Sequence, residues 1–287
     1  MLSLSLNSLS VDLLNPADAR DRARMGTRYC WGGYIWQVHD EHAGPLLSGP
    51  EFPTEESPTP FNGQGAPESF RHAEFGTDRS LILENGRGFI IGIGEVAPGN
   101  GDDLVVTKPC SWSVTRSAAA IDFYTVQAGG KYGCRLSRRI ALEGRSLTSF
   151  TKIINTGTVP LPVHWFAHPF FALTDGLISC GLPRSWDMAE NPGFAFDGER
   201  RLGMLRRFKD KMDGHFQQLV VGPKTPLRAA VSHPRLSKVF FSTDFTPDQC
   251  PVWGNSNTWS IEPYITAELA PGATRSWTLT YEFGAVM

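Results

Sequence analysis

The sequence lacks several features that mark large classes of proteins. Its 27 basic and 29 acidic side chains give a net charge of −2, so it has no excess of positive charge with which to bind a nucleic-acid backbone. No apolar stretch approaches the roughly 18 residues of a membrane span. The N-terminal residues show no positive segment ahead of an apolar one, and no Asn-x-Ser/Thr acceptor occurs. We therefore expect a cytoplasmic protein that binds neither nucleic acid nor membrane.

The cysteines form none of the common cysteine-based sites. They are odd in number, lie far apart and include no C-x-x-C pair: Cys30, Cys110, Cys134, Cys180 and Cys250. This pattern indicates neither a zinc ribbon nor a thioredoxin-like redox site. Scattered cysteines of this kind are typical of small buried side chains in a reducing compartment.

Glycine, proline and aromatic residues are abundant instead. The 287 residues include 29 Gly, 21 Pro, 18 Phe and 8 Trp, a mixture that favours short strands joined by tight turns over helices. Hydrophobic residues mostly recur with a period of two, most clearly over residues 276–283, and only residues 16–25 read as a helix. Composition does not shift along the chain. We therefore predict one all-β domain over residues 1–287, built from two large packed antiparallel sheets.

Two N-terminal segments carry further expectations. Residues 28–31 and 34–38, which are rich in aromatic and β-branched side chains and are separated by Gly32-Gly33, predict a β-hairpin. The stretch from 44 to 68 is rich in Pro, Gly, Ser and Glu. Loops of this length in a compact domain tend to cover or build sites.

Two apparent motifs can be set aside. Gly92-Ile-Gly94 is followed by residues that cannot open the helix of a dinucleotide-binding fingerprint, so a β-turn is the better interpretation. His164 and His168 have the spacing of a metal-binding helix but lie in a proline-rich strand segment. On a strand they are about 13 Å apart, which exceeds the reach of one zinc ion. We expect no metal site, and a packed or surface role for His164.

Two other titratable residues stand out by their position at strand ends. His168 ends an apolar strand directly before Pro169, and Glu262, far downstream, directly precedes Pro263. Proline marks strand ends and bulges, where a side chain can be re-aimed toward a cleft. On these grounds alone, His168 could equally be a satisfied strand-end histidine and Glu262 a surface carboxylate.

The surrounding residues add a resemblance to a known family. A strand, the turn Asn155-Thr-Gly157 and a second strand ending in His168-Pro-Phe-Phe are followed much later by Ile261-Glu-Pro, then Leu269-Ala-Pro-Gly and a closing aromatic strand. In order and spacing these segments resemble the aldose 1-epimerase (galactose mutarotase-like) superfamily, closest to the branch that includes the hexose-6-phosphate mutarotases and many uncharacterised relatives. The resemblance covers residues 145–283.

The resemblance implies a large antiparallel β-supersandwich with a sugar cleft across one sheet. It implies that His168 is the general acid and Glu262 the general base of a mutarotase, an isomerase that interconverts the anomers of an aldose or a sugar phosphate. A base and an acid on opposite sides of one acetal are sufficient for this reaction, so no cofactor or metal is expected. The protein would be a monomer or a homodimer with a small-molecule carbohydrate as its partner. A carboxylate near the histidine would help to keep His168 protonated around neutral pH.

Further site residues are less clearly indicated. Members of the superfamily usually present a His or an Arg near a Gly-rich loop in the first third, and Arg71 or His72 could fill that role here, although the usual His-Gly order is absent. Trp253 could stack on the apolar face of a pyranose.

Two other functions remain open at this point. One is a non-catalytic carbohydrate-binding or regulatory protein on the same fold, because fold does not determine activity. The other is a glycosidase or a polysaccharide lyase, either of which needs a second catalytic group. In a glycosidase, Glu68 or Glu74 would pair with Glu262, at about 5–5.5 Å if the enzyme is retaining or about 6.5–9.5 Å if it is inverting.

Overall fold

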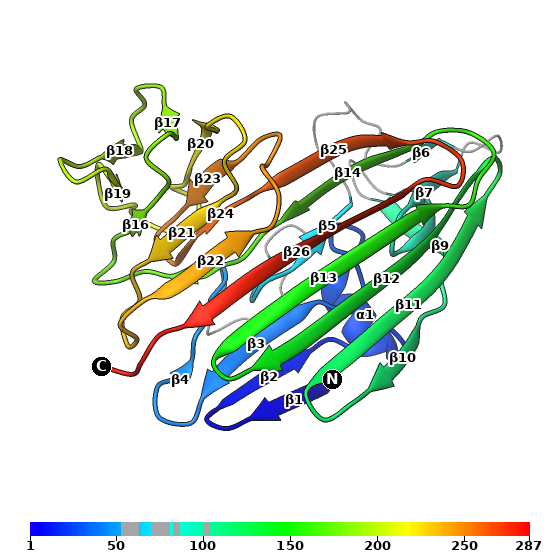
Figure 1. Cartoon of the computed structure of the whole chain (residues 1–287), viewed down its shortest axis with the longest axis horizontal. Helices are drawn as coiled ribbons and strands as arrows, with labels where there is room; N and C mark the ends of the chain where they lie inside the picture. Colours follow the sequence, from blue (N-terminus) through cyan, green and yellow to red (C-terminus); the bar gives the residue numbers. More distant parts are fainter. Residues whose placement is uncertain (53–62, 71–80, 83–86, 100–103) are drawn as a thin grey trace.

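The computed structural model describes residues 1–52, 63–70, 81–82, 87–99 and 104–287. Strands dominate these residues, and the expected all-β class is confirmed (Figure 1). The one helix of the described chain is α1, Ala19–Met25, within the segment that the sequence predicted. The Asp18 carboxylate caps it by accepting hydrogen bonds from the backbone N–H groups of Arg20 and Asp21. No described helix has the length and hydropathy needed to cross a bilayer.

The largest sheet has ten antiparallel strands in the order β10-β11-β12-β13-β26-β22-β21-β16-β19-β18. Figure 1 shows its long strands β11, β12, β13 and β26 lying side by side across the molecule. The alternation predicted for residues 276–283 is confirmed, because Trp277, Leu279, Tyr281 and Phe283 are all buried. The strands span Ser113–Arg116 (β10), Ala120–Gly129 (β11), Tyr132–Glu143 (β12), Ser146–Asn155 (β13), Thr274–Phe283 (β26), Val239–Thr243 (β22), Arg228–Val231 (β21), Ser179–Gly181 (β16), Arg201–Met204 (β19) and Phe194–Phe196 (β18).

Four smaller sheets complete the fold, in the orders β1-β2-β3-β4, β25-β14-β5, β15-β24-β23-β20-β17 and β6-β7-β8-β9. The first two consist of Leu2–Leu6 (β1), Leu9–Leu13 (β2), Ile35–Asp40 (β3), Gly44–Pro45 (β4), Tyr264–Leu269 (β25), Leu161–Ala167 (β14) and Glu68–Ser69 (β5). The other two consist of Phe171–Ala172 (β15), Thr258–Ile261 (β24), Pro251–Gly254 (β23), His215–Val220 (β20), Asp187–Met188 (β17), Leu81–Ile82 (β6), Gly88–Ile90 (β7), Gly94–Pro98 (β8) and Leu104–Pro109 (β9).

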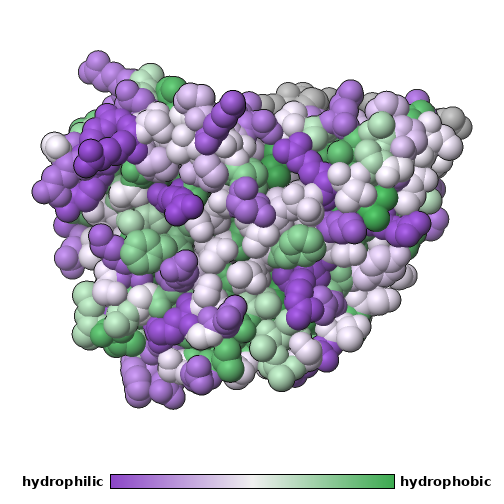
Figure 2. Space-filling view, viewed as in Figure 1, coloured by the Kyte–Doolittle hydropathy of each residue, from purple (hydrophilic) through white to green (hydrophobic). Residues whose placement is uncertain are grey.

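The ten-stranded sheet packs on the smaller sheets through a core of large aromatic side chains. Trp277 of β26 meets Trp165 of β14 with ring centroids 5.0 Å apart, and both side chains are almost fully buried. Aromatic pairs at this spacing contribute stability beyond the area they bury. The opposite side of the ten-stranded sheet faces solvent, where polar and apolar residues are interspersed (Figure 2).

The hairpin predicted for residues 28–38 is wrong in its first half. Residues 28–31 form no strand, and β3 pairs instead with β2 and β4. The Cys30 N–H donates to the backbone carbonyl of Glu68 at 2.8 Å, and the Ser69 hydroxyl donates to the carbonyl of Arg28 at 2.5 Å. Residues 28–30 are therefore held by β5 through these bonds.

A buried ion pair joins β5 to the ten-stranded sheet. Arg138 of β12 donates to the carboxylate of Glu68, and both residues are 1 % exposed. The same guanidinium donates to the hydroxyls of Ser149 at 2.7 Å and Thr151 at 3.1 Å, and to the carbonyl of Gly32 at 2.6 Å. Every one of its nitrogens therefore has an acceptor, as a charge removed from water requires.

Both carboxylate oxygens of Glu68 accept hydrogen bonds as well. Its Oε1 also accepts from Ser149 at 2.6 Å, and its Oε2 accepts from the indole N–H of Trp165 at 3.0 Å. One carboxylate thus bonds to β12, β13 and β14 at once. The ion pair fixes the two-residue strand β5 between the sheets, although its backbone pairs with β14 at only two positions.

We predict that Arg138→Met lowers the free energy of unfolding by about 3–5 kcal/mol, because it leaves the Glu68 carboxylate buried without its counter-charge. Urea unfolding followed by tryptophan fluorescence measures the change. The matched control is Arg139→Met on the same strand. The pair between Arg139 and Asp122 is 49 % and 43 % exposed, so its loss should cost less than about 1 kcal/mol. Equal costs for the two variants would contradict the prediction.

Candidate active site

His168 lies directly after β14, where the chain leaves the sheet before Pro169. Its backbone N–H donates to the carbonyl of Pro67 at 2.9 Å, and the preceding Ala167 pairs with Glu68 of β5. The proline prevents the strand from continuing its ladder. The backbone at His168 is therefore held at the end of a strand by residues 67–68, and only 6 % of the residue is exposed.

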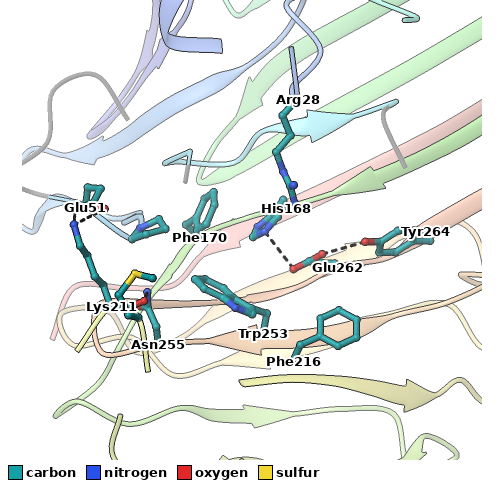
Figure 3. Close-up of a pocket in the computed structure, with 12 residues that line it drawn as sticks. Arg28, Glu51, His168, Phe170, Lys211, Phe216, Trp253, Asn255, Glu262 and Tyr264 are labelled. Atoms are coloured by element: carbon teal, nitrogen blue, oxygen red, sulfur yellow. Dashed lines mark hydrogen bonds and ion pairs between the residues drawn. The ribbon is translucent and has the colours of Figure 1, made fainter. Parts of the chain in front are cut away.

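Glu262 directly follows β24 and precedes Pro263, in the same kind of position. Its backbone N–H donates to the carbonyl of Pro251 at 2.9 Å. The carboxylate Oε1 lies 3.3 Å from His168 Nε2, and its Oε2 accepts a hydrogen bond from the Tyr264 hydroxyl at 3.3 Å (Figure 3). The structure thus brings together the two residues that the sequence singled out.

The pair faces a cavity of about 320 Å³ that also contains Trp253. Phe170 stacks on the His168 imidazole, with ring centroids 4.3 Å apart and an interplanar angle of 24°. Trp253 approaches the same imidazole edge-on at 6.0 Å. Aromatic rings beside a polar centre, in a cavity of this size, are typical of sites for small ligands.

Burial controls the protonation of His168. Loss of solvent, followed by the positive charge of Arg28, holds the pKa of His168 well below its usual value of 6.5. The expectation that His168 stays protonated near neutral pH is therefore not supported by these surroundings. Its Nδ1 is buried and has no hydrogen-bond partner within the described parts of the chain.

Burial acts in the opposite direction on Glu262, because it penalises the charged form of an acid. It raises the pKa of Glu262 to about 7, although Arg28 and the hydrogen bond from Tyr264 act to lower it. Below about pH 7 these surroundings favour a neutral imidazole beside a protonated carboxyl group. The arrangement can accept a proton at one atom and donate one at a neighbouring atom.

Arg28 lines the cavity and was not singled out in the sequence. It comes from the irregular segment 28–31, with its guanidinium 5.7 Å from the Phe166 ring centroid and 5.6 Å from that of Tyr29. Arg28 has no sequence signal of its own, because the composition of its segment predicts a strand whose side chains alternate between two faces.

Lys211 and Glu51 are two further lining residues without a sequence signal. The Lys211 amine donates to both carboxylate oxygens of Glu51, at 2.8 and 2.6 Å. Glu51 lies within the 44–68 stretch that was expected to build or cover a site. The Asn255 amide, which also lines the cavity, donates to the Lys211 carbonyl at 3.0 Å and so fixes the loop that carries the lysine.

The other proposed site residues fall into two groups. Arg71, His72 and Glu74 lie outside the described residues. Glu68 is described, but it is held in the core by Arg138 and does not line the cavity, so its suggested pairing with Glu262 in a glycosidase is wrong. Within the described ranges, no three His, Cys, Asp or Glu side chains are grouped so that they could hold a metal ion.

No family model matches the sequence, and no curated protein is significantly similar to it. Solved structures do match. A galactose mutarotase-like protein from Lactobacillus casei superposes with a TM-score of 0.62 at 12% identity, covering 99% of each chain. A galactose mutarotase related enzyme from Lactobacillus acidophilus gives 0.61 at 12% identity, covering 100% of this chain and 98% of that one. A galactose 1-epimerase from Lactobacillus acidophilus gives 0.55 at 12% identity, covering 98% and 93%. The protein therefore shares the antiparallel β-sandwich fold of these galactose mutarotase-like structures.

Proposed function

We propose that the protein is an aldose 1-epimerase-like enzyme that interconverts the anomers of an aldose or a sugar phosphate. The observation that carries this proposal is the contact of 3.3 Å between His168 Nε2 and Glu262 Oε1 at one cavity. The fold supports it, since one of the similar structures is a galactose 1-epimerase. Both residues are buried, so water has little access to them and would compete little with the proposed proton transfers.

The reaction needs one proton acceptor and one proton donor. The acceptor removes the proton of the anomeric hydroxyl while the donor protonates the ring oxygen, and the bond between C1 and the ring oxygen breaks. The open aldehyde turns about its C1–C2 bond, and the reverse transfers close the ring on its other face. Donor and acceptor end in their starting states, so the pair needs no external proton and no redox partner.

A single proton shared by His168 and Glu262 meets this requirement. The resemblance to the superfamily puts that proton on His168 as the acid, with Glu262 as the base. The surroundings in the empty cavity favour the other form, with the proton on Glu262. The two forms differ only by a proton transfer between atoms 3.3 Å apart, so the number of bound protons is the same in both.

The neighbouring side chains suit a sugar ring. In the proposal, Trp253 covers the apolar face of the pyranose, and the Arg28 guanidinium donates hydrogen bonds to ring hydroxyls. Arg71 and His72 remain predicted contacts from the N-terminal third.

We predict that His168→Ala and Glu262→Gln each lower kcat by about 10²- to 10⁴-fold, because each removes one of the two proton-transfer groups. Two-dimensional exchange NMR on free and phosphorylated hexoses measures the anomer interconversion rate. The matched control is Glu282→Gln, an exposed carboxylate on β26, which should retain the full rate. Full activity of His168→Ala would contradict the mechanism. Saturable sugar binding by the wild type without acceleration would identify a non-catalytic carbohydrate-binding protein.

We predict that kcat/KM of the free enzyme falls about tenfold per pH unit above about pH 7. The pair loses its shared proton as Glu262 ionises, with a pKa of about 7, and neither residue can then donate. The profile is measured by exchange NMR, with the enzyme-free rate subtracted at each pH. A kcat/KM that stays constant or rises between pH 7 and 9 would show that ionised Glu262 beside neutral His168 is the working form.

The same ionisation predicts a change in stability. The folded-state pKa of Glu262 is about 7, above its ordinary value of 4.5. Its contribution to the free energy of unfolding is therefore fully present below pH 4.5 and is lost as the pH rises through 7. Glu262→Gln removes this loss because glutamine does not ionise. The variant should therefore gain stability relative to the wild type between pH 5 and 8, as measured by thermal unfolding at a series of pH values. A constant difference across this range would contradict the buried ionisation.

A further inference from the structure

The pocket-facing side of the five-stranded sheet carries a row of side chains that leads away from Glu262. In the antiparallel register Ser260 of β24 pairs with Trp253 of β23, and Trp253 pairs with Phe216 of β20. Residues paired directly across strands lie on the same face of a sheet. Figure 3 shows Trp253 and Phe216 on neighbouring strands beneath His168 and Glu262. Two strand spacings, about 10 Å, separate the Phe216 strand from the Ser260 strand.

Phe216 faces water at the outer end of this row. It lines the cavity and is nevertheless 55 % exposed. Gln218 and Val220, on the same face of β20, are also exposed, whereas Leu219 between them is buried. The core therefore uses the opposite face of this strand, and the Phe216 ring adds an aromatic surface to the mouth of the cavity.

The charges at the mouth are already paired. Lys211 donates to both oxygens of Glu51, so an anionic group arriving here would have to displace a carboxylate. A neutral polar ligand meets no such competition. The cavity volume of about 320 Å³ is at the small end of the range for ligand sites, so a ligand longer than one ring would extend across the mouth.

We propose, as an extension of the proposed function, that the preferred substrate is the reducing end of a neutral oligosaccharide. The reducing-end ring lies against His168 and Glu262, and the next ring stacks on Phe216. Trp253 lies between the two positions and contacts the first ring. Stacking uses the apolar CH face of a pyranose and needs no charge, which matches the exposed ring of Phe216 and the paired ions that line the same cavity.

The catalytic test compares kcat/KM for maltose, cellobiose and lactose with the values for glucose and galactose, by exchange NMR. Phe216→Ala should lower the ratio of disaccharide to monosaccharide kcat/KM by about twofold to tenfold, the range expected for one lost aromatic contact. Phe240→Ala, on β22 outside the cavity and 46 % exposed, should leave the ratio unchanged. An unchanged ratio in Phe216→Ala, or a wild type that prefers hexose phosphates to every neutral disaccharide, would overturn the proposal.

A binding test separates this inference from the proposed activity. Methyl glycosides of the same disaccharides cannot open their rings, so their dissociation constants, measured by calorimetry, do not depend on turnover. Phe216→Ala should raise these constants by the same twofold to tenfold and leave those of methyl monosaccharides less affected. If Phe216→Ala weakens disaccharide binding in this way but no sugar shows anomer exchange, the Phe216 subsite is supported and the proposed epimerase activity is contradicted. If anomer exchange occurs but Phe216→Ala changes the dissociation constants of disaccharides and monosaccharides equally, the proposed activity is supported and the Phe216 subsite is overturned.

Discussion

The buried pair of Glu68 and Arg138 is the interaction on which the geometry of the cavity depends. β5 has only two residues, too few to hold a position through backbone bonds alone, and the ion pair anchors it to β12. The β5 backbone in turn pairs with Ala167, next to His168, and accepts a hydrogen bond from Cys30, two residues after Arg28. One carboxylate in the core therefore positions both the proposed proton-transfer histidine and the cation that acts on its pKa.

Burying titratable groups costs folding free energy, and the cavity contains several such groups. Burial penalises the charged forms of both His168 and Glu262, and Arg28 adds a positive charge that opposes protonation of the histidine and favours ionisation of the carboxyl group. Below about pH 7, a pair in these surroundings holds one proton and does not form a full ion pair. This matches a reaction that consumes and returns one proton at the same site, and it differs from the Glu68–Arg138 pair, where every polar atom of the guanidinium has a partner. Sites of the first kind are typical of proton-transfer chemistry.

The fold class could be predicted from the sequence because its signal is local, whereas His168 and Glu262 were paired only by the resemblance to the superfamily. Alternation over residues 276–283 shows which side chains are buried, and Pro169 and Pro263 show where strands end beside His168 and Glu262. Arg28 could not be predicted, since its segment has the aromatic composition of a strand but is held in an irregular path by β5. The contact of Lys211 with Glu51 joins residues 160 positions apart, and Phe216 reaches the cavity only through the register of β20 with β23. Such contacts depend on how strands are ordered in a sheet, which composition and periodicity do not encode.

The cavity divides into a base and a mouth with different physical roles. At the base, the proposed acid–base chemistry at an anomeric carbon would need little more than His168 and Glu262, and it would make few demands on the rest of the sugar. Selectivity must then come from the side chains that surround the rest of the ligand. Here the mouth presents the exposed ring of Phe216 and the cation of Lys211, which is already paired with the carboxylate of Glu51. Phe216 and Lys211 lie within the span of the resemblance to the superfamily but outside its motifs, and Glu51 lies outside that span. Since the similar structures are about 12% identical to this chain, they show a shared fold and give no information on the side chains of the mouth. If the proposed function holds, the choice of sugar would therefore depend on residues of this chain such as Phe216, Lys211 and Glu51.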